Sequence, residues 1–238
     1  IAFQGVGNGT TVDYVQVHNN ADDGVEFFGG TVNAKHLYLS GNEDDSLDWT
    51  FGYSGKIQHV VITHRDISDK VIEADNNNSN RDSLPRARPM ISNVTVIGNA
   101  NAGGGVLLRE GTGAKLSNFV ITGADKYCFS IDHDQTFNNA GTSATALTGN
   151  LTVTNSVANC AVSFKNDTAD LFKTSDWFNG QTGNTTTAMG MGTSYINNAA
   201  VNAQTAAAPF DSFFDATTYI GAVKDAASDW TVGWTFKP

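Results

Sequence analysis

The chain has few basic residues, few prolines, only two cysteines and no long apolar run. Lys and Arg number 14 against 24 Asp and Glu, which gives a formal net charge of -10. Because contact with phosphates needs a basic face, this balance argues against nucleic acid or an anionic membrane as a partner. No apolar run approaches the roughly 20 residues that cross a bilayer, so we expect no membrane span.

Charge of either sign is sparse as well. Charged residues make up 16% of the 238 residues, while Asn, Thr, Ala and Gly are abundant. This composition is typical of a secreted protein rather than a cytosolic one, so we expect an extracellular or cell-surface location. The sequence begins at Ile1 inside a strand-like segment, and we expect the parent protein to be longer at its N-terminus.

One phrase of the sequence repeats. Residues 20–27 (NADDGVEF) return as residues 42–49 (NEDDSLDW), and a short alternating run precedes each copy. Looser copies continue to about residue 164 and give at least six coils with two or more strands each. A period in the low twenties, built from short strands and Asn/Gly/Asp turns, is typical of a solenoid. Parallel stacking of equivalent strands then predicts an all-β, right-handed parallel β-helix.

The repeat also suggests how the chain is divided. We expect the β-helix to occupy residues 1–205 as one domain, with insertions at coil corners in 75–88, 136–146 and 167–200. Residues 206–238 contain Trp230 and Trp234 and are expected to form a C-terminal cap over the last coil.

The repeat predicts which core residues of successive coils stack on one another. Alternation along each strand turns Val25, Leu47 and Ile72 inward as one ladder, with Phe27 and Trp49 as the neighbouring aromatic rung. The residues between them, Glu26 and Asp48, then face solvent.

Carboxylates recur at one corner of successive coils. Like charges about 5 Å apart raise one another's pKa, so such a stack implies a bound cation, a shared proton or basic partners. Calcium prefers hard oxygen ligands. The alternative is that the Asp pairs only form turns by accepting hydrogen bonds from backbone N–H groups. The candidate calcium ligands are Asp23, Asp45, Asp66 and Asp69.

A ligand platform is the second candidate site. Trp49 and Tyr53 end the second coil, and flat aromatic rings can stack on sugar rings. Glu26 and Asp48 would be their polar neighbours. The alternative is that Trp49 belongs to the core and Tyr53 covers a corner.

The two cysteines form a candidate disulfide. Cys128 and Cys160 occupy similar places in successive coils. Stacked residues lie about 4.8 Å apart, within the Cα separation that a disulfide tolerates. A bridge would imply an oxidising compartment, and the alternative is two buried thiols.

The repeats resemble those of a known group of proteins. Segments 15–33 and 91–98, with the closing segment 213–235, resemble bacterial secreted or lipid-anchored parallel β-helix proteins of unassigned function. This resemblance implies a location on or outside a bacterial cell surface and brings no activity with it.

A more distant resemblance is to polygalacturonases and pectate lyases. Asn20-Ala21-Asp22 followed by Asp44-Asp45 is similar to the Asn-x-Asp and Asp-Asp motifs of the hydrolases. The resemblance implies that Asp22, Asp44 and Asp45 supply the general acid and the base that activates water. Of the Arg-x-Pro-x-x-Arg signature of the lyases, Pro85 and Arg88 remain, and Ser83 replaces the first Arg.

Two functions follow from these patterns. We favour a non-catalytic extracellular module, structural or glycan-binding and ordered by calcium, whose partners are a polysaccharide or cell-surface glycan and other copies meeting at the solenoid ends. The alternative is a glycoside hydrolase or polysaccharide lyase that acts on an acidic polysaccharide, with Asp22, Asp44, Asp45 and Arg88 as its catalytic residues.

Overall fold

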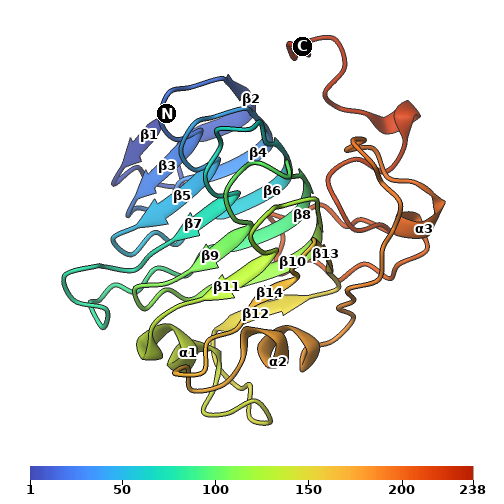
Figure 1. Cartoon of the computed structure of the whole chain (residues 1–238). Coiled ribbons are helices and arrows are strands. Elements are labelled where there is room, and N and C mark those ends of the chain that lie inside the picture. Colours follow the sequence, from blue (N-terminus) through green and yellow to red (C-terminus); the bar gives the residue numbers. More distant parts are fainter. Residues whose placement is uncertain (238) are drawn as a thin grey trace.

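The protein is a parallel β-helix built from two sheets (Figure 1). A computed structural model describes residues 1–237. The first sheet, sheet A, contains in spatial order β1 (Ala2–Gln4), β3 (Val25–Phe28), β5 (Leu47–Thr50), β7 (Ile72–Ala74), β9 (Val106–Leu108), β11 (Phe129–Ile131) and β14 (Phe164–Lys165). The second, sheet B, contains β2 (Thr11–His18), β4 (Asn33–Ser40), β6 (Lys56–Thr63), β8 (Met90–Ile97), β10 (Ala114–Thr122) and β12 (Leu151–Thr154), and β13 (Val157–Asn159) also pairs with β10.

Each turn of the chain adds one strand to each sheet. From β2 to β11 the strands alternate between sheet B and sheet A, and every strand pair is parallel. Figure 1 shows the strands stacked in chain order from blue to yellow. The predicted all-β parallel β-helix is confirmed, and its coils number at least the six that the sequence indicated.

Sheet B is bent along a line of residues with left-handed backbone. The bend residue of each coil has φ between 51° and 62°, and parallel register breaks there. Asn tolerates this conformation better than most residues, whereas Tyr and His are unusual in it. The side chains of these bend residues leave sheet B on its outer side. These residues, named here the bend line, are Tyr14, His36, His59, Asn93, Asn118 and Asn155.

The core has the predicted register. Val25 pairs with Leu47 and Leu47 with Ile72, and all three are at most 1% exposed. On the neighbouring rung Phe27 pairs with Trp49, and both side chains are completely buried. Burial of large side chains at about 25 cal/mol per Å² of apolar surface is the main force that holds the coils together.

Two short helices cover the end of the solenoid at the last coils. They are α1 (Asp134–Ala140) and α2 (Thr174–Asn179), which lie below β11, β12 and β14 in Figure 1. Phe137 of α1 and Trp177 and Phe178 of α2 are completely buried in the main core. These aromatic side chains shield the apolar interior of the last coils from water.

We had expected the C-terminal segment, residues 206–238, to cover this end, but it does not. After α3 (Ala199–Asn202) it runs back along the outer side of sheet B, and the short helix η1 (Ala226–Ser228) lies within it. Asn93 of the bend line donates to the carbonyls of Tyr219 and Gly221 at 3.2 and 3.1 Å. At the first coils, Gln16 exchanges two 2.8 Å hydrogen bonds with the backbone of Phe236. The segment is therefore a lateral brace across the coils.

Cys128 and Cys160 are joined by a disulfide with a Cα separation of 5.6 Å. The two residues are not stacked equivalents, contrary to the geometry we assumed. Phe129 pairs with Phe164, so Ser163 lies beside Cys128, and Cys160 follows β13 at the preceding corner. The bridge ties the end of sheet B to the start of sheet A across that corner.

Within residues 1–237 no helix is long and apolar enough to cross a membrane, and the longest, α1, has seven residues.

Candidate functional site: an acidic corner

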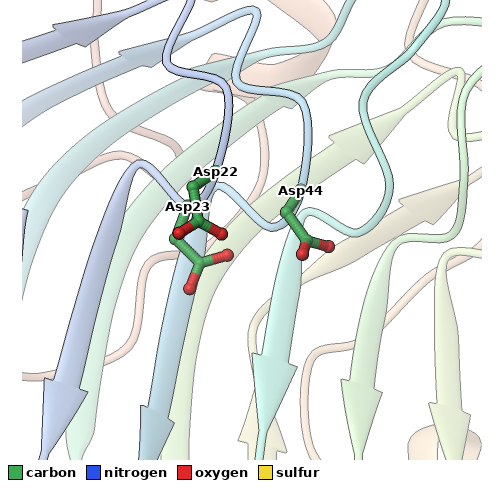
Figure 2. A group of neighbouring side chains, drawn as sticks. All are labelled: Asp22, Asp23 and Asp44. Carbon is green, nitrogen blue, oxygen red and sulfur yellow. The ribbon is translucent and has the colours of Figure 1, made fainter.

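The carboxylates gather where the chain passes from sheet B to sheet A. The turns before β3, β5 and β7 lie at this corner, and the pairing of Val25 with Leu47 brings Asp23 beside Asp45. Figure 2 shows Asp22 and Asp23 leaving one turn and Asp44 leaving the adjacent turn, with their carboxylates on the same side. We call this group the acidic corner; its members are Asp22, Asp23, Glu26, Asp44, Asp45, Asp48, Asp69 and Glu73.

Carboxylate oxygens at the acidic corner lie within reach of a common ion. In each of four overlapping sets of three residues, one oxygen per residue lies within 4.8 Å of the others. The sets are Asp22, Asp23 and Asp44; Asp23, Glu26 and Asp48; Asp44, Asp45 and Asp69; and Asp45, Asp48 and Glu73. The structure thus brings together three of the four predicted metal ligands and both predicted polar neighbours of the platform.

Asp66, the fourth predicted ligand, lies apart from the acidic corner. It is exposed and belongs to none of the four sets. The pairing of Leu47 with Ile72 explains why, because it brings Asp44 beside Asp69 and leaves Asp66 in the turn that precedes them. We therefore withdraw Asp66 as a candidate ligand.

The same side chains also organise the turns. Asp23 Oδ1 accepts a hydrogen bond from the Asp45 N–H at 3.0 Å, and Asp45 Oδ1 accepts one from the Lys70 N–H at 2.8 Å. Each carboxylate therefore ties one coil to the next, as the turn-forming alternative predicts. These bonds use one oxygen of each carboxylate, and the other oxygen is left for a further partner.

Burial raises the pKa of five carboxyl groups at the acidic corner, those of Asp23, Glu26, Asp44, Asp45 and Asp48. Removal from water is the largest cause at each, and neighbouring carboxylates add to it. The pKa rises to about 6 for Asp23, to about 7 for Glu26, to about 8 for Asp45 and to about 9 for Asp48. Glu26 and Asp48 do point away from the core, but they are half-buried rather than solvated as we predicted.

Two cations neutralise the far side of the acidic corner. Lys70 Nζ lies 2.6 Å from Asp69 Oδ2 and 3.0 Å from Glu73 Oε1. Arg109 donates to Asp75 at 2.8 Å and also pairs with Glu73. Burial works against the charge of Lys70, but the hydrogen bond to Asp69 and the nearby carboxylates outweigh it and raise the pKa of Lys70.

The first two coils have no such neutralisation. Within residues 1–237, Asp45 is the one acidic-corner carboxylate of these two coils that has a Lys or Arg nitrogen within 4.0 Å, at 3.8 Å from Lys70 Nζ. Glu43, which lies outside the acidic corner, pairs with Arg65 at 3.0 Å. Five carboxylates therefore remain without a basic partner: Asp22, Asp23, Glu26, Asp44 and Asp48.

Lys70, Arg109 and Glu73 are the residues that our sequence reasoning failed to place. The pairing of Leu47 with Ile72 puts Lys70, not Asp69, at the level of Asp23 and Asp45. Glu73 pairs with Asp48 in the same register. The predicted ladder of Leu47 and Ile72 already implied the places of Lys70 and Glu73, but the candidate ligands were chosen from the Asp residues of the turns.

The aromatic platform is not present. Trp49 and Tyr53 are both completely buried. Trp49 Nε1 donates to Thr112 Oγ1 at 3.0 Å, and the Tyr53 hydroxyl donates to the Val32 carbonyl at 2.8 Å. Because buried rings with satisfied polar atoms cannot stack on a sugar, the prediction for these two residues is wrong and the core alternative holds.

Arg88 is separated from the predicted catalytic carboxylates. It lies just before β8, at the corner where the chain passes from sheet A to sheet B, and its N–H donates to the Tyr53 carbonyl at 2.9 Å. Asp22, Asp44 and Asp45 lie at the other corner, and Asp45 is almost fully buried. The four residues therefore do not form one site.

The acidic corner fits a calcium ion by two criteria. Its donors are hard carboxylate oxygens, which calcium prefers. With calcium–oxygen distances of about 2.3–2.6 Å, ligand oxygens lie at most about 5 Å apart, and each of the four sets meets this limit at 4.8 Å. Two further polar atoms of the same turns, Asn42 Nδ2 and Ser46 Oγ, are buried without a protein partner.

These features match one protein family. The family model of the pectate-lyase-like beta helix domain matches residues 1–235, and the chain belongs to this family. Searches of curated proteins and of solved structures found no significant match.

Proposed function

We propose that the protein is a non-catalytic extracellular β-helix module that binds calcium at the acidic corner and, through it, an acidic glycan. The observation that carries this proposal is the set of five carboxylates on the first two coils without a basic partner, packed within 4.8 Å of one another in groups of three. A divalent cation would relieve their mutual repulsion.

The choice of glycan follows from coordination chemistry. Calcium takes six to eight oxygen ligands, whereas each set supplies three carboxylates. The remaining positions would be open to water or to carboxylate and hydroxyl oxygens of a sugar. Bound calcium would thereby let a chain of net charge -10 hold an anionic polysaccharide that it would otherwise repel.

An extracellular location is supported by the disulfide between Cys128 and Cys160. Disulfides persist in oxidising compartments and are rare in the cytosol. The sparse charge of the sequence is in keeping with the same location.

One observation favours an enzymatic alternative. The raised pKa of Asp48, about 9, keeps this carboxyl protonated at neutral pH beside the more acidic Asp23. A neutral carboxyl next to an ionised one is the arrangement that glycoside hydrolases use as acid and base. The separation of Arg88 from the acidic corner removes the lyase version of this alternative.

The test is an assay of binding and turnover on uronate-containing polysaccharides in millimolar calcium and in chelator. We expect retention of the protein on these polysaccharides in calcium, loss of retention in chelator, and neither new reducing ends nor unsaturated products. The variant Asp48→Asn should weaken calcium-dependent retention, and the exposed control Asp66→Asn should not. Release of products by the wild type, lost in Asp48→Asn, would establish the hydrolase instead.

A further inference from the structure

A second polar site lies at the corner opposite the acidic one. A cavity of about 280 Å³ opens there, lined by Ser54, Arg88, Met90, Lys115 and Asn150. It lies where the chain passes from sheet A to sheet B, so sheet A separates it from the acidic corner. No step of the proposed function uses it.

The register of sheet B explains the cavity. Met90 pairs with Lys56 and Lys115, and Ala114 pairs with Leu151. Residues just before these strands therefore also stack from coil to coil, in the order Ser54, Arg88, Gly113, Asn150. Three of these four positions carry polar side chains and one carries none.

Gly113 lies between Arg88 and Asn150 in this stack, beside the cavity. A Cβ at this position would lie 3.7 Å from Arg88 Cβ and 3.8 Å from the Asn150 carbonyl oxygen, which is ordinary van der Waals contact. Its φ is outside the left-handed region, so the backbone does not require glycine there. The missing side chain leaves space between Arg88 and Asn150 that a longer residue would fill.

The polar groups around the hollow are free. Within residues 1–237, neither the Arg88 guanidinium nor the Lys115 ammonium has a carboxylate within 4.0 Å, although the chain carries 24 acidic residues. The Ser54 hydroxyl and the Asn150 side-chain amide make no hydrogen bond to another residue in this range. Two unpaired cations in an acidic protein thus converge with two uncharged polar groups on one cavity.

We infer that this cavity, named here the basic pocket, binds the anionic substituent of a saccharide, a carboxylate or a sulfate ester. The planar guanidinium of Arg88 can donate two parallel hydrogen bonds to either group, and Lys115 adds a second positive charge. Ser54 and Asn150 can pair with sugar hydroxyls, and Met90 offers an apolar surface to the ring. This binding goes beyond the calcium-dependent function and requires no cation.

The test measures binding of an oligogalacturonate trimer by titration calorimetry in chelator, so that the acidic corner contributes nothing. We expect the methyl-esterified trimer, which has the same sugars without charge, to bind at least tenfold more weakly. Arg88→Gln and Lys115→Gln should each lower the affinity about five- to tenfold, as expected for loss of a charge-assisted hydrogen bond at a partly exposed site. A sulfated galactose trisaccharide is the second probe. The tighter of the two ligands, the oligogalacturonate or the sulfated trisaccharide, shows whether the pocket prefers a carboxylate or a sulfate ester.

Gly113→Gln keeps both charges and fills the hollow, and we expect it to abolish binding. Lys126→Gln is the matched control, because Lys126 is exposed, lies at another corner and makes no ion pair within residues 1–237. Wild-type affinity in both Arg88→Gln and Gly113→Gln would overturn the proposal, as would equal binding of the methyl ester. Calcium is absent from this titration, so a lack of binding would not affect the expected rise of the melting temperature with calcium. The two proposals can therefore fail separately.

Discussion

Asp48→Asn should stabilise the protein in chelator, although it removes a side chain from the candidate calcium site. Asp48 is half-buried and packed among Asp23, Glu26, Asp45 and Glu73, and its pKa rises to about 9. Asn has nearly the same shape and no charge. The substitution therefore removes the cost of keeping a buried carboxyl protonated at neutral pH and leaves the packing of the corner unchanged.

The magnitude follows from the raised pKa. At pH 7 an unfolded Asp with its ordinary pKa of 3.8 is ionised, while folded Asp48 is protonated, and the difference corresponds to about 4 kcal/mol. The buried amide of Asn keeps part of the desolvation penalty, so we expect a gain of about 2 kcal/mol. For a domain of this size that is a rise in the melting temperature of roughly 4–8 °C.

The gain should depend on pH with a defined sign. A carboxyl whose pKa is raised on folding contributes full stability below about pH 4, and this stability is lost as pH rises toward the folded value of about 9. The wild type in chelator should therefore weaken between pH 4 and pH 9. Asp48→Asn should show little gain at pH 4, and its gain should increase with pH up to about pH 9.

The assay is a thermal melt of wild type, Asp48→Asn and the control Asp66→Asn in chelator and in calcium, across this pH range. In calcium the order should reverse, because the wild type gains stability from the ion and Asp48→Asn has lost a ligand. Destabilisation of Asp48→Asn in chelator at pH 8 would refute the electrostatic reasoning.

Three further predictions concern the fold. Leu47→Asp should destabilise the protein by about 3–5 kcal/mol, because it places an unpaired charge in the ladder between Val25 and Ile72; normal folding of the variant would contradict the register. Thiol labelling under denaturing, non-reducing conditions should find no reactive thiol, and two labelled thiols would mean that the pair is free. Replacing Cys128 and Cys160 by Ala should lower the free energy of unfolding by about 3–4 kcal/mol for a sequence separation of 32. Trp49→Ala should cost about 3–5 kcal/mol in denaturant titrations, while Phe51→Ala, whose side chain is 54% exposed, should change stability by less than about 1 kcal/mol; equal effects would contradict the buried position of Trp49.

The sequence alone was sufficient to predict the fold and the core register. Strand alternation set Phe27 and Trp49 inward from the first two coils, because a one-residue shift would have exposed the whole inner face. The same alternation argues against an aromatic platform at Trp49. Local periodicity thus determines which residues are buried wherever the repeat is regular.

Sequence reasoning failed where the corners change length. The third turn is longer than the second, so matching Asp pairs between turns hid the stacking of Lys70 on Asp45. The position of the C-terminal segment also lay beyond reach, because hydrogen bonds from Asn93 to Tyr219 and Gly221 join residues more than 120 positions apart and no periodic pattern marks them.

The most direct test of the central claim is the response of the wild-type protein to calcium. With a cation bound only to the folded state at the acidic corner, the melting temperature should rise in proportion to the logarithm of calcium concentration, and the fall in stability between pH 4 and pH 9 should disappear. Elemental analysis should find calcium in the protein after dialysis. An unchanged midpoint in millimolar calcium, with no bound metal, would contradict the account and leave the carboxylates as turn-forming residues.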